Sequence, residues 1–297
     1  MEKRRSRKHH YLPRHYLKGF TNPDNSFYVY DKKTDNIFVS SPGSFFFEND
    51  LNTVDLKEGS SDFLEDMYTS VEGKFWNSLD TIRDSSHMDS ITTLDKMNLF
   101  FFLSIQHWRL PRNSSHVESL SKEFFRGEKF EYFKLNSKSG DSIPEEEIQK
   151  LTGSDGFKKS ARLMIPFAPF YTKEWQDSIN NWNFSYSGDN GNWHMVGDSP
   201  IITDGEHDHD PEKCLNKFIF PVSGRVLLIN NGNKLETREL PDDFILQYNV
   251  ALLHKAERFI ASPNKELLEA VVFLHKNYVD NEMTHLILME LFWHLNK

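Results

Sequence analysis

The stretch KFIFPVSGRVLLI, residues 217–229, contains two short apolar runs that are separated by a Ser-Gly pair. Short apolar runs that are rich in β-branched and aromatic side chains and are bounded by turn residues predict strands. Similar runs occur at 193–196 and 201–202. We therefore predict that these segments are strands of one sheet, a short mixed or antiparallel sheet around residues 184–230.

Amphipathic patterns on both sides of this sheet predict helices. Apolar residues recur at helical spacing from Leu64 to Ile82, and Ser61 is a suitable N-cap, so one long helix is predicted there. The same pattern predicts further helices over residues 93–109, 115–135, 172–182, 242–260, 264–278 and 284–295. Two apolar-rich runs, 27–30 and 37–40, predict an N-terminal β-hairpin. The predicted fold class is α+β, predominantly helical, with this small hairpin and the short sheet.

Length and composition set the domain organisation. The chain has 297 residues, and its 25 Phe, 10 Tyr and 6 Trp exclude a disordered protein. We predict a single domain over residues 1–297. The polar segment 136–160 predicts a loose linker between an N-terminal helical half and a C-terminal half of sheet and helices.

Cysteine usage and hydropathy favour a cytoplasmic protein. The single cysteine, Cys214, excludes a disulfide framework and any site built from several thiolates. The longest apolar run, 99–103, is far shorter than the ~20 residues of a membrane span, and the basic N-terminus lacks the apolar stretch of a signal peptide. We therefore expect no membrane partner.

Charge is distributed unevenly along the chain. The formal net charge is −9, but residues 1–18 carry +6, so the remaining residues carry −15. A basic segment on an acidic body can attract a polyanion such as nucleic acid. The alternative for the first seven residues is a solvated tail without a binding role.

The N-terminal pattern HYLPxxYLxxF, residues 10–20, resembles the opening signature His-Tyr-Val-Pro-x-x-Tyr-Leu-x-x-Phe of the bacterial family called domain of unknown function 4238. Further similar motifs follow in the family's order, at 27–31, 64–72, 106–111, 195–201 and 220–223, and at Asn249. Two positions differ, because Gly197 and Ser199 stand where the family has Ser and Asn. The resemblance implies the family's architecture and, by analogy with its phage-defence settings, an effector, nuclease or toxin.

The N-terminal motif supplies the first candidate site residues. His10 could act as a general acid or base or bind a metal, because imidazole titrates near neutrality. Tyr11 and Arg14 could hold a phosphate. Alternatively, His10 caps a turn while Tyr11 packs in the core. The neighbouring His9 and His15 are expected to be exposed or part of a basic patch.

The motif Asp198-Ser199-Pro200 supplies the second set, because carboxylates at strand ends commonly face a cleft. Asp198 is the candidate catalytic carboxylate and Ser199 a substrate-binding residue. With His10, Asp198 is also a candidate ligand for a divalent metal, Mg or Mn. The alternative role for Asp198 is an Asx-turn.

The end of the helix over 93–109 supplies the third set. Gln106 could bind substrate, and Arg109 could clamp a phosphate or pair with Asp198. Alternatively, Arg109 only complements the helix dipole. Glu65 and Glu72 lie seven residues apart on the predicted long helix, hence on one face, and Glu65 could reach the site.

The string EHDHD, residues 206–210, resembles a metal site by composition, although a solvated loop is the simpler interpretation. The signatures of P-loop, Rossmann and α/β-hydrolase enzymes are absent from the sequence. We expect an intracellular hydrolase of nucleic acid or a nucleotide, with His10, Asp198 and Arg109 as its catalytic residues. The alternative is a non-catalytic binding or sensor module in which the HYLP segment is structural. The sequence carries no signal for the oligomeric state.

Overall fold

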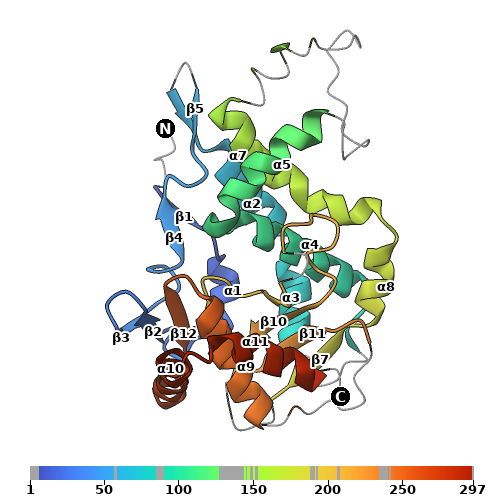
Figure 1. The fold of residues 1–297 in the computed structure, drawn as a ribbon. Helices are drawn as coiled ribbons and strands as arrows, with labels where there is room; N and C mark the ends of the chain where they lie inside the picture. The colour runs from blue at the N-terminus through green and yellow to red at the C-terminus, as the bar shows by residue number, and fades with distance from the viewer. Residues whose placement is uncertain are drawn as a thin grey trace.

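A computed structural model describes residues 7–56, 59–84, 90–126, 144, 146–147, 150, 153–187, 191, 193–205, 208–233, 240 and 242–295. The described helices are α1 Arg14–Lys18, α2 Phe63–Glu72, α3 Trp76–Asp84, α4 Thr93–Arg109, α5 Ser114–Arg126, α7 Asp155–Met164, α8 Glu174–Asn180, α9 Asp242–Lys255, α10 Lys265–Asp280 and α11 Thr284–Leu295, with 3-10 turns η2 Pro111–Asn113 and η3 Ile165–Tyr171. Figure 1 shows α9, α10 and α11 gathered at one end of the molecule and α2, α5 and α7 at the opposite end.

Two four-stranded antiparallel sheets lie next to the C-terminal helices. Their strand orders are β7-β11-β10-β9 and β3-β2-β12-β8. The strands are β2 Phe27–Asp31, β3 Asn36–Ser40, β7 Asn183–Tyr186, β8 Val196–Gly197, β9 Ile202–Thr203, β10 Phe218–Ser223, β11 Val226–Asn230 and β12 Phe259–Ser262. Two further antiparallel pairs join β1 Lys8–His10 to β4 Phe47–Asn49 and β5 Val54–Leu56 to β6 Gly59–Ser61. The predicted α+β class and the N-terminal hairpin, β2 with β3, are confirmed.

The sheet around residues 184–230 is antiparallel, but one of its predicted strands belongs elsewhere. The segment 193–196 leads into β8, which pairs with β12 in the other sheet, and β7 takes the outer position beside β11 instead. Strand β12 lies where the end of a helix over 242–260 was predicted, so that prediction was wrong beyond α9. The helix ends because the carboxylate of Asp198 binds the next three free backbone N–H groups, those of residues 257–259.

The long helix predicted from Ser61 is two helices. The backbone N–H of Gly73 caps α2 by donating to the carbonyl of Thr69, and α3 begins three residues later. Glycine has the weakest helix propensity after proline, which favours a break at this point. The predicted apolar stripe is nevertheless buried, because Leu64, Phe75 and Ile82 all lie in the core.

Helix α5 begins as predicted, but the part of that prediction beyond residue 126 lies outside the described residues. Much of the predicted linker, 136–160, also lies outside them. Its last residues are not a linker, because 155–160 form the start of α7, which packs against α5, β5 and η3. The larger core cluster extends from Tyr11 to Ala261 and so contains residues from both predicted halves.

The N-terminal motif is anchored in this core. Tyr16 of α1 donates its hydroxyl hydrogen bond to the Pro221 carbonyl at 2.8 Å and stacks on Phe220, with ring centroids 5.3 Å apart. Arg83 of α3 donates to the carbonyls of Tyr16 and Val222 at 2.6 and 3.1 Å. These bonds fix α1 against β10. They hold the beginning of the chain in one position relative to the second half.

No helix in the described ranges is long and apolar enough to cross a membrane. Cys214 is free and buried, and burial raises the pKa of its thiol above the usual range.

His194 is a buried histidine, with 1% of its surface exposed, beside Tyr248. Neither of its ring nitrogens has a hydrogen-bond partner among the described residues. Burial lowers its pKa to about 3, so the folded protein holds this imidazole neutral at all but strongly acidic pH. An unfolded chain binds a proton here near the ordinary pKa of about 6.5.

We therefore expect His194→Leu to reduce the acid sensitivity of the fold. From about pH 6.5 down to pH 3 the unfolded state binds a proton that the folded state lacks, so stability falls as the pH falls. Without His194, the slope of unfolding free energy against pH should decrease by up to about 1.4 kcal/mol per pH unit. Urea denaturation between pH 4 and pH 7 measures this slope, and an unchanged slope would contradict the assignment.

Candidate functional site

His10 lies on β1, where it is buried and opposite Phe47 of β4. Its Nε2 accepts a hydrogen bond from Arg14 Nε at 3.4 Å, and its ring also bonds to the backbone of Pro42 and Gly43. Burial, with the charges of Arg14 and Arg109, lowers its pKa to about 4. At neutral pH His10 is therefore an uncharged imidazole that connects β1 to the loop before β4. Its neighbours His9 and His15 are not simply exposed, because His9 is fully buried and His15 binds Asp80 at 2.9 Å.

The predicted residues of α4 lie behind the N-terminal motif. Gln106 is buried, and its side-chain amide donates to the Tyr11 carbonyl. Arg109 is 2% exposed, and its guanidinium pairs with Glu72 and lies 3.5 Å from Glu65. Arg109 thus binds the two glutamates of α2, and the predicted pairing of Arg109 with Asp198 is not formed.

This α2–α4 contact is a buried ion-pair network. The Arg109 guanidinium also lies over the ring of Tyr68, 4.3 Å from its centroid. Burial raises the pKa of Glu72 to about 7, although Arg109 favours its charged form. Glu65 accepts a hydrogen bond from Asn52 at 2.7 Å, and the backbone N–H of Asn52 donates to the His9 ring. The network therefore links α2, α4 and β1 beneath the site.

Asp198 follows β8 and turns its carboxylate toward the segment between α9 and β12. Its Oδ1 accepts from the Glu257 N–H at 2.8 Å, and its Oδ2 accepts from the Arg258 and Phe259 N–H groups at 2.7 and 2.8 Å. Burial raises the pKa of Asp198, and the three N–H donors oppose this shift. A carboxylate offers about four lone-pair positions, so one acceptor position remains for a ligand or water.

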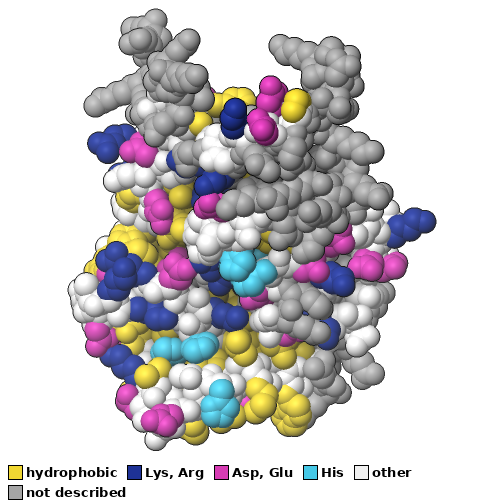
Figure 2. Space-filling model, turned by 45° about the horizontal axis from the view of Figure 1, so that its top comes forward, with side chains coloured by type: hydrophobic (Ala, Val, Ile, Leu, Met, Phe, Trp, Pro, Cys, Tyr) yellow, Lys and Arg dark blue, Asp and Glu magenta, His cyan; other side chains and the backbone are white. Residues whose placement is uncertain are grey.

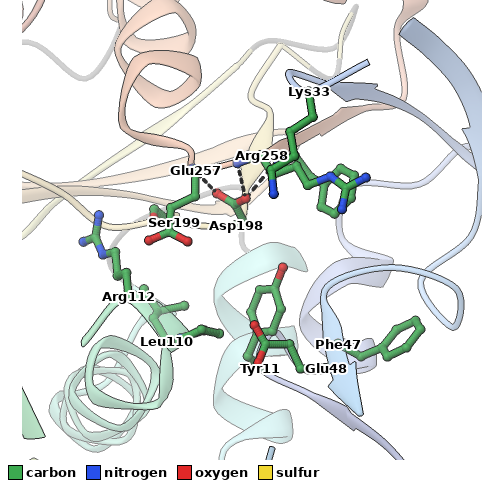
Figure 3. A pocket seen from close by; sticks show the side chains of 12 residues that line it. Tyr11, Lys33, Phe47, Glu48, Leu110, Arg112, Asp198, Ser199, Glu257 and Arg258 are labelled. Carbon is green, nitrogen blue, oxygen red and sulfur yellow. Dashed lines mark hydrogen bonds between the residues drawn. The ribbon is translucent and has the colours of Figure 1, made fainter. Parts of the chain in front are cut away.

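Asp198 lines a pocket of about 240 Å³ together with Tyr11 and Ser199. Figure 3 shows the Tyr11 hydroxyl pointing toward Asp198 from the opposite wall. The Ser199 side chain is 1% exposed, and its hydroxyl has no described hydrogen-bond partner. The remaining lining residues are Lys33, Phe47, Glu48, Leu110, Pro111, Arg112, Glu257, Arg258 and Phe259.

Arg112 is the cation at the α4 side of this pocket (Figure 3). Burial lowers the pKa of its guanidinium, while the charges of Asp208, Glu257 and Asp198 raise it. No hydrogen bond or ion pair joins the Arg112 side chain to a described residue, whereas Arg258 is held by Asp31 through two bonds of 3.0 and 2.7 Å. Arg112 is thus a half-buried guanidinium that is available for an anion.

The structure brings three of the seven predicted site residues into this pocket, namely Tyr11, Asp198 and Ser199. The other four do not line it: Gln106 holds the Tyr11 carbonyl, Arg109 pairs with the glutamates of α2, and Arg14 is an exposed residue that donates to His10. Sequence reasoning missed Arg112 as the phosphate-binding candidate, and it missed Glu48 and Glu257. The signal for Arg112 was Pro111, which ends α4 and redirects the chain so that the next residue faces the pocket.

The described residues contain no group of three or more His, Cys, Asp or Glu side chains that could hold a metal ion. Of the EHDHD string, Glu206 and His207 lie outside the described part. Asp208 is held by the Thr203 hydroxyl and lies 3.8 Å from Lys255, so it is not simply solvated. The predicted Mg or Mn site stays a prediction.

Comparison with known proteins adds one match. A family model with the description "Protein of unknown function (DUF4238)" matches residues 8–266. This range includes every residue that lines the pocket. No curated protein and no solved structure matches the chain.

Proposed function

Because the chain belongs to the DUF4238 family of proteins of unknown function, we propose its function from the pocket: an effector enzyme of the cytoplasm that hydrolyses a phosphoester of a nucleotide or nucleic acid. The observation that carries this proposal is the unpaired guanidinium of Arg112 beside the unpaired hydroxyl of Ser199. Both residues line a pocket that also contains Tyr11 and Asp198.

Arg112 and Ser199 would bind the phosphate. A guanidinium presents a planar fork of N–H donors that matches two phosphate oxygens, and a charge-assisted bond of this kind is roughly twice as strong as a neutral one. The Ser199 hydroxyl adds a further donor. Since both groups lack a described protein partner, a bound phosphate replaces water and displaces no internal hydrogen bond.

Asp198 and Tyr11 would act on the reacting atoms. The remaining acceptor position of Asp198 takes a proton from a water whose oxygen bonds to phosphorus as the ester P–O bond breaks. The proton then passes to the leaving oxygen. Burial and the nearby carboxylates raise the pKa of Tyr11, so its phenol stays protonated and donates a hydrogen bond to a phosphate oxygen.

A binding or sensor module is the second candidate, and one observation favours it. Bonds within the protein already occupy several of the predicted site groups, namely Gln106, Arg109 and three lone-pair positions of Asp198. In this case the HYLP segment is structural, and the same pocket binds the phosphate ligand without turnover. Binding and hydrolysis must therefore be measured separately.

Arg112→Met is the test of the phosphate site. Hydrogen bonds to charged groups contribute about 1.5–3 kcal/mol, so the variant should lose about 10- to 100-fold in phosphate-ligand affinity and in kcat/KM. Calorimetry with mononucleotides measures binding. Hydrolysis is followed on mononucleotides and short RNA and DNA oligonucleotides, with and without Mg²⁺ or Mn²⁺.

The control for this experiment is Lys18→Met, which removes an exposed cation of α1 outside the pocket and should change neither quantity. Binding without hydrolysis would select the sensor module. The absence of both from the wild-type protein, or equal affinity of wild type and Arg112→Met, would refute the proposed pocket.

A further inference from the structure

We propose that the pocket selects guanine nucleotides, because it sets an unpaired guanidinium against an unpaired carboxylate on the opposite wall. This inference rests on the proposed function and names its substrate class. The two groups are Arg112 and Glu48. Neither side chain has a hydrogen bond or ion pair to a described residue.

Unpaired charges of both signs line the pocket. Four charged side chains of the pocket form no hydrogen bond or ion pair with a described residue: Lys33, Glu48, Arg112 and Glu257. Arg258, by contrast, is neutralised by Asp31. A pocket for a bare anion would carry cations alone. This one also presents carboxylates, which accept hydrogen bonds and repel anions. Its ligand should therefore combine an anionic group with a group that donates hydrogen bonds.

The charges are separated across the pocket. Figure 3 shows Arg112 on the side of Ser199 and Leu110, and Glu48 on the other side below the Tyr11 ring. Glu48 is an exposed residue of β4 that lines the pocket, and its charge helps to raise the pKa of the Tyr11 phenol. A phosphate at Arg112 therefore directs the rest of the ligand toward Glu48.

Guanine matches this second end of the pocket. Its N1–H and exocyclic amino group are adjacent donors, and a carboxylate has two oxygens that accept from both. Adenine and cytosine offer only one amino group on that edge, and uracil offers a single N–H. Leu110 and Phe47 also line the pocket and supply apolar surface for a flat base.

The surface charge favours a small ligand over a long polyanion. On the face in Figure 2, Lys and Arg side chains alternate with Asp and Glu side chains instead of forming one basic field. A groove for a nucleic-acid backbone needs a positive surface that follows successive phosphates. A mononucleotide, or the terminal nucleotide of a strand, needs only the single cation that Arg112 provides.

The experiment compares nucleotides that differ by single groups. The Kd of the wild-type protein is measured by calorimetry for GMP, for IMP, which lacks the 2-amino group, and for AMP. We expect GMP to bind about 10-fold more tightly than IMP and AMP, as one bond to a charged acceptor provides. Glu48→Gln should abolish the preference for GMP while leaving the affinity for AMP, which has no N1–H, within about twofold.

The matched variant is Glu257→Gln, which removes the pocket carboxylate on the Arg112 side and should keep the preference for GMP. Equal binding of GMP, IMP and AMP would overturn guanine selection and leave the phosphate site intact. A preference for GMP that survives in Glu48→Gln would also overturn it. If no nucleotide binds, the proposed function itself fails.

Discussion

Asp198→Asn is expected to lower the free energy of unfolding by about 3–5 kcal/mol and to remove ligand binding at the same time. Three backbone N–H groups, those of residues 257–259, donate to the two carboxylate oxygens of Asp198. An amide offers one acceptor oxygen, and its NH₂ group meets at least one of these donors. Each unsatisfied buried donor costs about 1–3 kcal/mol, and bonds to a charged acceptor contribute about 1.5–3 kcal/mol.

Urea denaturation of wild type and Asp198→Asn measures this loss of stability. Glu257→Gln is the control, because the Glu257 side chain lacks a described partner. It should alter the free energy of unfolding by less than about 0.5 kcal/mol. Stability and ligand binding should be lost together for a geometric reason. The segment 257–259 leads from α9 into β12, and all three of its residues line the pocket. A loss below 1 kcal/mol would show that Asp198 does not hold this segment.

The motif around Asp198 explains how far the sequence could predict the site. A carboxylate followed by Ser-Pro at a strand end indicated an important residue, but the suggested roles of catalytic carboxylate, metal ligand and Asx-turn did not include holding a distant segment of the backbone. Its partners lie about sixty residues away, at 257–259, in a stretch whose apolar pattern continues that of a helix. Local periodicity records which residues are buried, so it could not reveal that a distant side chain ends α9 and starts β12.

The two arginines at the end of α4 show the same limit. Arg109 and Arg112 are both cations near a helix C-terminus, and sequence spacing cannot distinguish them. The packing of α2 decides between them, since its Glu65 and Glu72 take Arg109 and leave Arg112 to the pocket. The spacing of those glutamates did predict a shared face, because positions seven apart coincide after two helical turns.

Arg109→Met is the second substitution with a large expected effect, a loss of about 3–5 kcal/mol, because removing one partner of a buried pair leaves an uncompensated charge. Arg109 is 2% exposed, and its partner Glu72 is also buried. The effect should depend on pH. Burial already raises the pKa of Glu72 to about 7, and without Arg109 it rises further. Glu72 then binds a proton in the folded state at pH values where the unfolded chain has lost it, so stability falls as the pH rises through this range.

The double variant Arg109→Met/Glu72→Leu distinguishes the contribution of the ion pair from the cost of leaving Glu72 as an unpaired buried charge. Replacing a buried pair by apolar side chains of similar volume is often neutral or stabilising, so the double variant should regain most of the lost stability and its excess loss at high pH should disappear. Arg7→Met breaks an exposed pair with Asp50, 3.4 Å apart, and should cost no more than about 1 kcal/mol. Urea denaturation at pH 6 and pH 9 measures all three variants. If Arg109→Met lost no more than Arg7→Met, the α2–α4 pair would not stabilise the fold, and Arg109 would again be a candidate for binding phosphate.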